Sequence, residues 1–134
     1  MSDHVEQLKA RYARWHESKG ASIDDWLSIL APGARIGSLA NGAAGAEFTA
    51  GGVGVEAARA YLEGLNQAWE MIEYQVHDMI ADGDRVVVLG HCSWRSRADG
   101  RELHTPKADI WRFEGDKATE FYEFYDTAAV LGMT

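Results

Sequence analysis

The order of hydrophobic patterns along the chain predicts a single α+β domain, with three N-terminal helices packed on a curved antiparallel sheet. In the first half of the 134 residues, apolar side chains recur every three or four positions, which is typical of amphipathic helices. The second half changes to strand-like runs rich in Val, Ile, Trp, Tyr and Phe. Helices first and strands afterwards favour an α+β domain over repeated βαβ units. The sequence contains no internal repeat and no linker, so residues 1–134 are expected to form one domain.

Two helices are expected near the start of the chain. The first spans residues 5–19, with Gly20 as its C-terminal cap. Ser22 is a candidate N-cap for the second helix, and Pro32 with Gly33 is expected to stop it. Both helices carry an apolar face and are expected to pack against the sheet.

A short strand and a third helix are expected next. Residues 34–39 indicate the strand, and residues 55–69 carry the apolar spacing of the helix. The segment between them, residues 41–54, is rich in Gly and Ala and has no periodicity. Loops of this length in compact domains are often functional, so the segment is interpreted as a mobile loop or flap.

Four strands are expected in the second half of the chain. Asp-Gly or Glu-Gly sequences separate them, which are signals for hairpin turns. Three consecutive hairpins form an antiparallel meander. The strands span residues 72–81, 85–97, 101–114 and 117–126.

The charge and cysteine content of the chain exclude several classes of function. A formal net charge of −8 and a pI of about 5.0 disfavour binding to nucleic acid or to an anionic membrane surface. Cys92 is the only cysteine, so an intramolecular disulfide and a CxxC metal motif are both impossible. No metal is expected, because the sequence has no metal-ligand signature such as His-x-His. No cofactor is expected either. Without a signal peptide or an apolar run of membrane-spanning length, a cytoplasmic protein is expected.

The aromatic content points to a ligand pocket. The chain has five Trp and five Tyr, whose side chains combine a large apolar ring with one polar atom. Such side chains suit pocket walls, although they also suit subunit interfaces and ordinary core packing. A small hydrophobic molecule is therefore the expected partner, with Trp15 as one candidate wall residue.

Strand periodicity places several polar candidates on one face of the strand at residues 101–114. If Asp109 faces a pocket, then Lys107 and Trp111 face it too, because side chains alternate with a period of two. Lys107 would favour an ionised Asp109, whereas burial beside Trp111 would favour a neutral one, and the sequence leaves both states open. The alternative is that Asp109 and Lys107 form an ordinary structural ion pair.

A second candidate carboxyl lies on the final strand. Phe121, Glu123 and Tyr125 alternate along it and therefore share one face. Two carboxyls that face one apolar cavity can share a proton and so supply an acid and a base at neutral pH. The alternative is that Glu123 points to solvent or pairs with an arginine.

Two segments of the chain resemble the NTF2-like superfamily. They are residues 108–117, Ala-Asp-Ile-Trp-Arg-Phe-Glu-Gly-Asp-Lys, and residues 121–126, Phe-Tyr-Glu-Phe-Tyr-Asp. The resemblance is strongest to the SnoaL-like and ketosteroid-isomerase-like branches, covers nearly the whole chain, and implies a cone that encloses a pocket. This fold hosts isomerases, polyketide cyclases, dehydratases, epoxide hydrolases and non-catalytic binders, so it does not decide the activity.

The resemblance to ketosteroid isomerases implies roles for individual residues. Asp109 is similar in position to the protonated aspartic acid of their oxyanion hole, and Tyr12 to the tyrosine that shares the hole. Their general-base aspartate corresponds to Ser38, which cannot take a proton at neutral pH without help. This departure counts against steroid double-bond isomerisation by the same mechanism.

The last strands resemble another branch in part. Glu123 is similar in position to a pocket aspartate of limonene-type epoxide hydrolases, but their Arg-x-Asp pair is replaced here by His91-Cys92-Ser93. His91 is a candidate general base, because histidine titrates near neutral pH. Trp94 has the opposite parity to His91, so both face the pocket only if a bulge intervenes.

The opposite face of the last strands is too aromatic to be left in water. Ile110, Arg112, Tyr122 and Phe124 fall on it, and large exposed apolar patches usually mark an interface. A homodimer through the sheet is expected, and the family resemblance implies the same.

The sequence thus predicts a small enzyme that applies acid/base chemistry to a hydrophobic carbonyl or hydroxyl compound, by isomerisation, cyclisation, hydration or dehydration. A non-catalytic ligand-binding or dimerisation module is the alternative. The candidate catalytic residues are Asp109, Tyr12, Glu123 and His91. The candidate substrate-binding residues are Trp15, Ser38, Trp111, Phe121, Tyr125 and Lys107.

Overall fold

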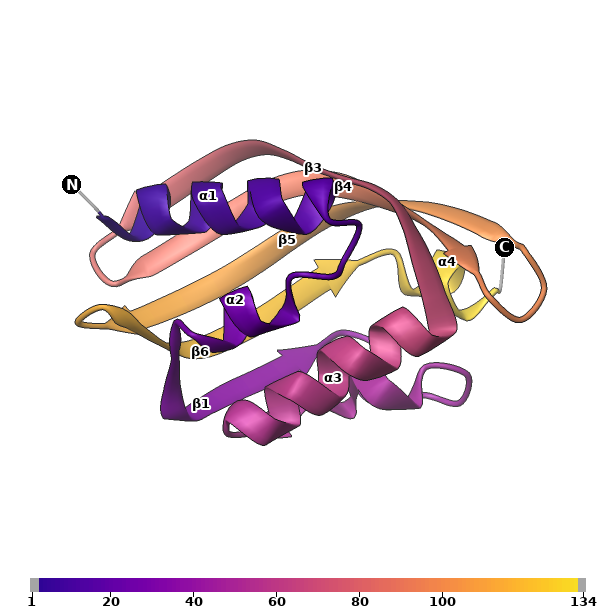
Figure 1. Cartoon of the computed structure of the whole chain (residues 1–134), viewed down its shortest axis with the longest axis horizontal. Coiled ribbons are helices and arrows are strands. Elements are labelled where there is room, and N and C mark those ends of the chain that lie inside the picture. Colours follow the sequence, from indigo (N-terminus) through magenta and orange to yellow (C-terminus); the bar gives the residue numbers. More distant parts are fainter. Residues whose placement is uncertain (1–2, 133–134) are drawn as a thin grey trace.

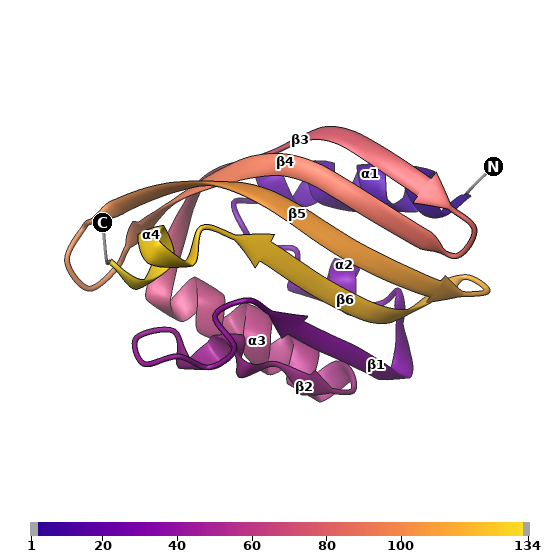
Figure 2. The same cartoon turned by 180° about the vertical axis from the view of Figure 1, so that it is seen from behind.

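The computed structural model describes residues 3–132 and contains a curved six-stranded sheet with helices on one face (Figure 1). The helices are α1 (Asp3–Glu17), α2 (Ile23–Leu27), α3 (Val55–Ala68), α4 (Thr127–Leu131) and the short 3-10 helix η1 (Glu47–Ala50). The strands are β1 (Leu30–Ser38), β2 (Gly52–Val53), β3 (Trp69–Asp82), β4 (Arg85–Ser96), β5 (Glu102–Glu114) and β6 (Lys117–Tyr125). Seen from behind, the outer face of the sheet lies in front of α1, α2 and α3 (Figure 2). The predicted α+β class is confirmed.

The strand order in the sheet is β2-β1-β6-β5-β4-β3. β3 to β6 form the predicted antiparallel meander. β1, however, pairs with β6 in parallel, with Ser38 opposite Glu123, so the sheet is mixed. β1 and β6 are separated in sequence by α3 and most of the meander, so no turn signal reports their relative direction.

The first and third predicted helices are confirmed, with small changes at their ends. Gly20 follows α1 with φ of 86°, and its N–H donates to the carbonyl of Trp15 at 3.0 Å, as a C-terminal cap requires. Ser22 precedes α2 but makes no capping hydrogen bond with its side chain. Across residues 3–132, every helix falls short of the length and apolarity that a membrane crossing requires.

The structure corrects the end of the second predicted helix. α2 ends at Leu27 and β1 begins at Leu30, so Pro32 and Gly33 lie inside a strand and do not stop a helix. The pairing of β1 with β6 is irregular between Leu30 and Arg35. A proline is tolerated there because its missing N–H interrupts no regular ladder.

The segment at residues 41–54 is partly tied to the sheet edge, which differs from a free flap. It contains η1 and β2, and β2 pairs antiparallel with β1 through Val53 opposite Arg35. Gly51 has φ of 70°, and a Cβ at this position would lie 2.1 Å from the carbonyl oxygen of Ile36. Only glycine lets the chain pass so close to β1.

The curvature of the sheet creates the concave face on which the helices pack. Pairing between β3 and β4 is irregular between Val76 and Asp78. Nearby on β4, a Cβ at Gly90 would lie 2.0 Å from the carbonyl oxygen of Gln75, so the two strands approach closely there. Bulges and glycines of this kind bend a sheet.

Candidate functional site

The concave face of the sheet and the helices over it enclose a cavity of about 110 Å³. Trp15, Trp111, Phe121 and Tyr125, the aromatic residues expected to bind substrate, all line it. The other aromatic wall residues are Tyr12, Trp26, Phe48, Tyr61, Trp69, Tyr74 and Trp94. A largely apolar wall with a few convergent polar groups is typical of small-molecule sites.

β5 supplies the polar centre of the cavity. Every second residue from Leu103 to Phe113 is buried, which confirms the predicted period of two. Lys107 and Asp109 therefore face the cavity. The register places Asp109 opposite Glu123 of β6, so two carboxyl groups lie on neighbouring strands of the same face.

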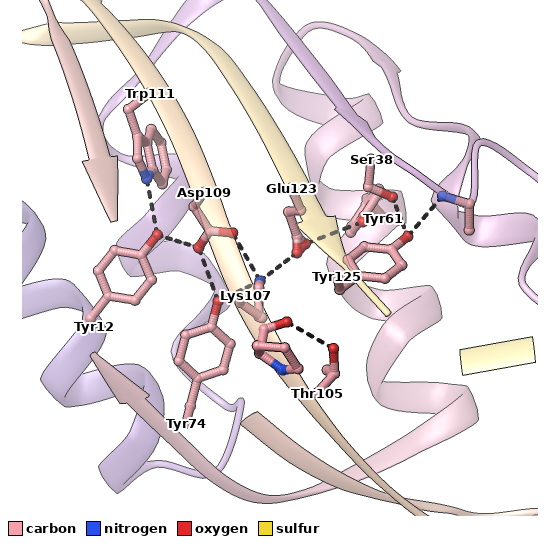
Figure 3. Close-up of polar contacts among 12 residues, drawn as sticks. Tyr12, Ser38, Tyr61, Tyr74, Thr105, Lys107, Asp109, Trp111, Glu123 and Tyr125 are labelled. Atoms are coloured by element: carbon pink, nitrogen blue, oxygen red, sulfur yellow. Dashed lines mark hydrogen bonds and ion pairs between the residues drawn. The ribbon is translucent and has the colours of Figure 1, made fainter. Parts of the chain in front are cut away.

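Asp109 is a buried carboxyl group surrounded by donors (Figure 3). The hydroxyls of Tyr12 and Tyr74 donate to its Oδ2 at 2.6 and 3.0 Å, and Lys107 Nζ lies 3.0 Å from its Oδ1. The indole N–H of Trp111 donates to the Tyr12 hydroxyl at 2.9 Å, which turns the Tyr12 proton toward Asp109. Three donors thus surround one carboxyl group, and Asp109 accepts hydrogen bonds from both tyrosines.

Lys107 joins the two carboxyl groups. Its Nζ lies 2.8 Å from Glu123 Oε1 and donates to the Tyr74 hydroxyl at 2.6 Å. It also lies 4.9 Å from the centre of the Tyr74 ring. Burial opposes the charge of Lys107, but Asp109 and Glu123 outweigh it and raise the lysine pKa well above its ordinary value. Lys107 is thus a fixed ammonium group, not a neutral amine nucleophile.

Glu123 is the more accessible of the two carboxyl groups. Its side chain is 12% exposed, compared with 2% for Asp109. The Tyr61 hydroxyl donates to its Oε2 at 3.3 Å. Burial raises the pKa of Glu123, and the charge of Asp109 adds to the effect, against the opposing influence of Lys107 and Tyr61. Glu123 therefore keeps a proton to a higher pH than an exposed glutamate does.

The three tyrosines around the cluster are neutral donors. Burial is the main cause that raises the pKa of Tyr12, Tyr61 and Tyr74 well above the ordinary tyrosine value. They surround one ammonium group and two carboxyl groups in an apolar cavity. Burial there disfavours the charged form of Glu123, whose pKa is raised.

Ser38 lies beside the carboxyl cluster on the neighbouring strand. It is buried, and its Oγ is 2.6 Å from the hydroxyl of Tyr125, which also accepts a hydrogen bond from the N–H of Ala40. Its register partner is Glu123. The position that corresponds to the general base of ketosteroid isomerases thus carries the Ser38 hydroxyl, paired with that of Tyr125. The nearest carboxyl group along the register, that of Glu123, lies on the neighbouring strand.

The structure places His91 outside the cavity and corrects its expected role as a base. Its Nδ1 is 2.7 Å from His77 Nε2, and its Nε2 is 3.5 Å from Glu73, all on the outer face of the sheet. Cys92 and Trp94 occupy the cavity side of β4 instead. The irregularities lie in β3, and side chains along β4 alternate between the two faces without interruption. Because Trp94 faces the cavity, His91, three residues before it, faces the other way.

Two residues that contact the cluster, Tyr61 and Tyr74, were not among the predicted site residues. Tyr61 lies on the apolar face of α3, where its spacing also fits ordinary core packing. Tyr74 lies between two irregularities of β3, so counting along the strand does not report which face it takes. Among residues 3–132, no three His, Cys, Asp or Glu side chains are grouped so that they could hold a metal ion.

A family model described as a SnoaL-like domain matches residues 9–121. The chain belongs to the SnoaL-like domain family. The matched region of this SnoaL-like domain includes Tyr12, Lys107 and Asp109 and ends two residues before Glu123. Comparison with curated protein sequences finds no match.

Solved structures share the NTF2-like fold of this SnoaL-like domain. An NTF2-like protein of unknown function from Burkholderia pseudomallei is 25% identical, with a TM-score of 0.80 over 96% of this chain and 94% of that one. TerC, co-crystallised with polyporic acid, is 23% identical, with a TM-score of 0.77 over 96% and 95% of the two chains. A hypothetical protein from Catenulispora acidiphila with a ketosteroid isomerase-like fold, in complex with trimethylamine, is 16% identical, with a TM-score of 0.75 over 95% and 90%.

Proposed function

We propose that this SnoaL-like domain is an enzyme that applies acid/base chemistry to a hydrophobic carbonyl or hydroxyl compound bound in the cavity. The observation that carries the proposal is the buried Asp109–Lys107–Glu123 cluster in a largely apolar wall. Buried titratable groups with perturbed pKa values in a cavity are typical of active sites. The co-crystallisation of TerC with polyporic acid supports a small organic molecule as the occupant of this fold.

Glu123 is the proton-transfer group in this proposal. Its raised pKa brings it closer to neutral pH, where a general base is most effective. The Glu123 carboxylate removes a proton from a carbon next to the substrate carbonyl. The C–H electron pair moves into the adjacent carbon–carbon bond, and the negative charge collects on the carbonyl oxygen.

Lys107 supplies the positive charge that stabilises this oxygen. To reach the oxygen, its ammonium group gives up one of its contacts with Tyr74, Asp109 or Glu123. The proton on Glu123 then returns in one of three ways: to the far carbon of a conjugated enolate, to a β-hydroxyl group that leaves as water, or to the alkoxide that forms when the enolate carbon attacks a second carbonyl. These three outcomes correspond to isomerisation, dehydration and cyclisation. The reaction class therefore depends on the substrate, while the proton-transfer group stays the same.

Asp109 has an orienting role in this mechanism. It holds Lys107 in its charged form and is itself fixed by Tyr12 and Tyr74. Its buried Oδ1 has the Lys107 charge beside it but no hydrogen bond among the described residues. A hydroxyl group of the substrate can donate to this oxygen, which would orient the molecule in the cavity.

A deuterium-incorporation experiment tests the proposal. The protein is incubated in D2O with a panel of hydrophobic aromatic ketones, and mass spectrometry follows deuterium entering the substrate. Glu123→Gln is expected to lower the incorporation rate at least about 100-fold, because the neutral amide cannot accept the proton. Glu120→Gln is the matched control, since Glu120 lies on the same strand and pairs with Arg35 at 3.0 Å.

Two results would count against this function. Equal incorporation by wild type and Glu123→Gln would remove Glu123 from the chemistry. Ligand binding without incorporation by either protein would identify a non-catalytic binding module.

We also propose a cytoplasmic location. The only cysteine, Cys92, is a free buried thiol, and burial raises its pKa to about 12. The protein thus needs no oxidising compartment for its stability. Fractionation of the source cells tests the proposal, and recovery from an extracytoplasmic fraction would contradict it.

A further inference from the structure

The C-terminal helix α4 covers one end of the cavity. Val130 of α4 lines the cavity together with Leu103 of β5 and Trp69 at the start of β3. Figure 1 shows α4 next to the turn that joins β4 and β5. All five residues of α4 remain partly exposed, and Val130 packs against the hydrophobic core.

The start of α4 is fixed to the cavity wall by polar contacts. The N–H of Asp126 donates to Thr105 Oγ1 at 2.8 Å, and Thr105 is a buried residue of the wall. Asp126 Oδ1 in turn accepts a hydrogen bond from the N–H of Ala129 at 3.1 Å and caps the helix. The N-terminal end of α4 is therefore anchored to β5.

Arg101 holds the other end of α4. Its Nη1 and Nη2 donate to the carbonyls of Ala129 and Val130 at 2.8 and 3.2 Å, and its guanidinium lies 5.3 Å from the centre of the Trp69 ring. Gly132 ends the helix in the left-handed conformation, and a Cβ there would lie 3.4 Å from Arg101 Nη2. The arginine thus binds the last carbonyls of α4 and at the same time covers a residue of the cavity wall.

A helix of five residues does not form alone, because helix nucleation is unfavourable. Because none of its five residues is fully buried, the position of α4 also depends on the contacts of Asp126 and Arg101. We propose that α4 is a lid on the cavity, that Arg101 is its latch, and that Val130 contacts the bound ligand. When the two carbonyls leave Arg101, α4 moves about Asp126 and the cavity opens at its Val130 end. This inference does not rest on the proposed chemistry, since Arg101 and Val130 lie outside the charged cluster.

Hydrogen exchange of the α4 amides tests the latch without any ligand. The N–H of Val130 donates to the carbonyl of Asp126 and reports closure of the helix. Arg101→Ala is expected to speed its exchange about tenfold, because the helix loses both contacts with the guanidinium. Arg97→Ala is the matched control: Arg97 belongs to the same turn and donates to the carbonyl of Asn66 at 2.7 Å, at the end of α3. Urea unfolding of both variants checks that global stability is retained.

The latch is overturned if Arg101→Ala and Arg97→Ala show the same rate of hydrogen exchange in α4.

The contact between Val130 and the ligand is tested with the apolar dye 1-anilinonaphthalene-8-sulfonate. Val130→Trp is expected to raise the Kd of the dye at least about tenfold by filling the lid end of the cavity, and Arg101→Ala to speed its association. An unchanged Kd in Val130→Trp overturns the ligand-contacting role of Val130.

Discussion

Lys107 is the residue on which the charged cluster depends. It is the cation between two buried carboxyl groups, at 3.0 Å from Asp109 and 2.8 Å from Glu123. Without it, both carboxyl groups would have to protonate or remain as unpaired charges in an apolar cavity. Breaking a buried ion pair from one side is costly for that reason.

Lys107→Met is therefore expected to lower the free energy of unfolding by about 3–5 kcal/mol at pH 7. Urea denaturation measures the loss. Adding Asp109→Asn should recover part of it, because one of the two unpaired charges is then removed. A Lys107→Met variant as stable as the wild type, or a double variant whose loss is the sum of the two single losses, would contradict this account.

The sequence predicts the inward-facing acids but not the groups that hold them. Alternation along β5 and β6, which pair without a shift from Lys107 to Arg112, is enough to bring Lys107, Asp109 and Glu123 together on one face. Tyr74 was missed, because it lies between two irregularities in β3. The hydrogen bonds that Asp109 accepts also come from side chains of α1 and β3, and no local pattern reports those contacts.

Among the elements, the hairpin strands were predictable and the path of β1 was not. Asp-Gly and Glu-Gly turns mark the ends of the meander strands directly. In β1, Pro32 follows apolar residues that fit a helix equally well. Their strand conformation results from the parallel pairing of β1 with β6. Long-range pairing of this kind overrides local signals.

Gly51 offers a test of how closely the edge segment follows β1. Gly51→Ala is expected to cost about 3 kcal/mol of unfolding free energy, since a positive φ is combined with a clash against the Ile36 carbonyl. Gly83 is the matched control, because it has φ of 62° with open space around it, and Gly83→Ala should cost only about 1 kcal/mol. Thermal or urea unfolding compares them, and equal losses would show that the contact with β1 is not tight.

For the whole molecule, the outer face of the sheet carries exposed apolar side chains. Leu89, Tyr122 and Phe124 are 36%, 38% and 41% exposed on it, and the Tyr122 and Phe124 rings lie 5.1 Å apart. Figure 2 shows this face of the sheet turned toward the viewer, away from α1, α2 and α3. We propose that a second copy of the chain covers it.

Light scattering coupled to gel filtration tests this association. The wild type is expected at the mass of a dimer, and Phe124→Glu at that of a monomer, because a charge would be buried without a partner. Val53→Glu is the control, since Val53 is 66% exposed on the edge strand β2. A monomeric wild type, or a dimeric Phe124→Glu variant, would contradict the proposed interface.

If Glu123 exchanges a proton inside the cavity, titration of its own carboxyl group reports this property without any substrate. Carbon-13 NMR follows the carboxyl carbon of Glu123 as the pH rises, with Glu123→Gln to assign the signal. Burial raises the pKa of Glu123 and Lys107 opposes the rise, so we expect a pKa above the ordinary value of about 4.3, and a further increase in Lys107→Met. A pKa at or below the ordinary value would contradict this expectation.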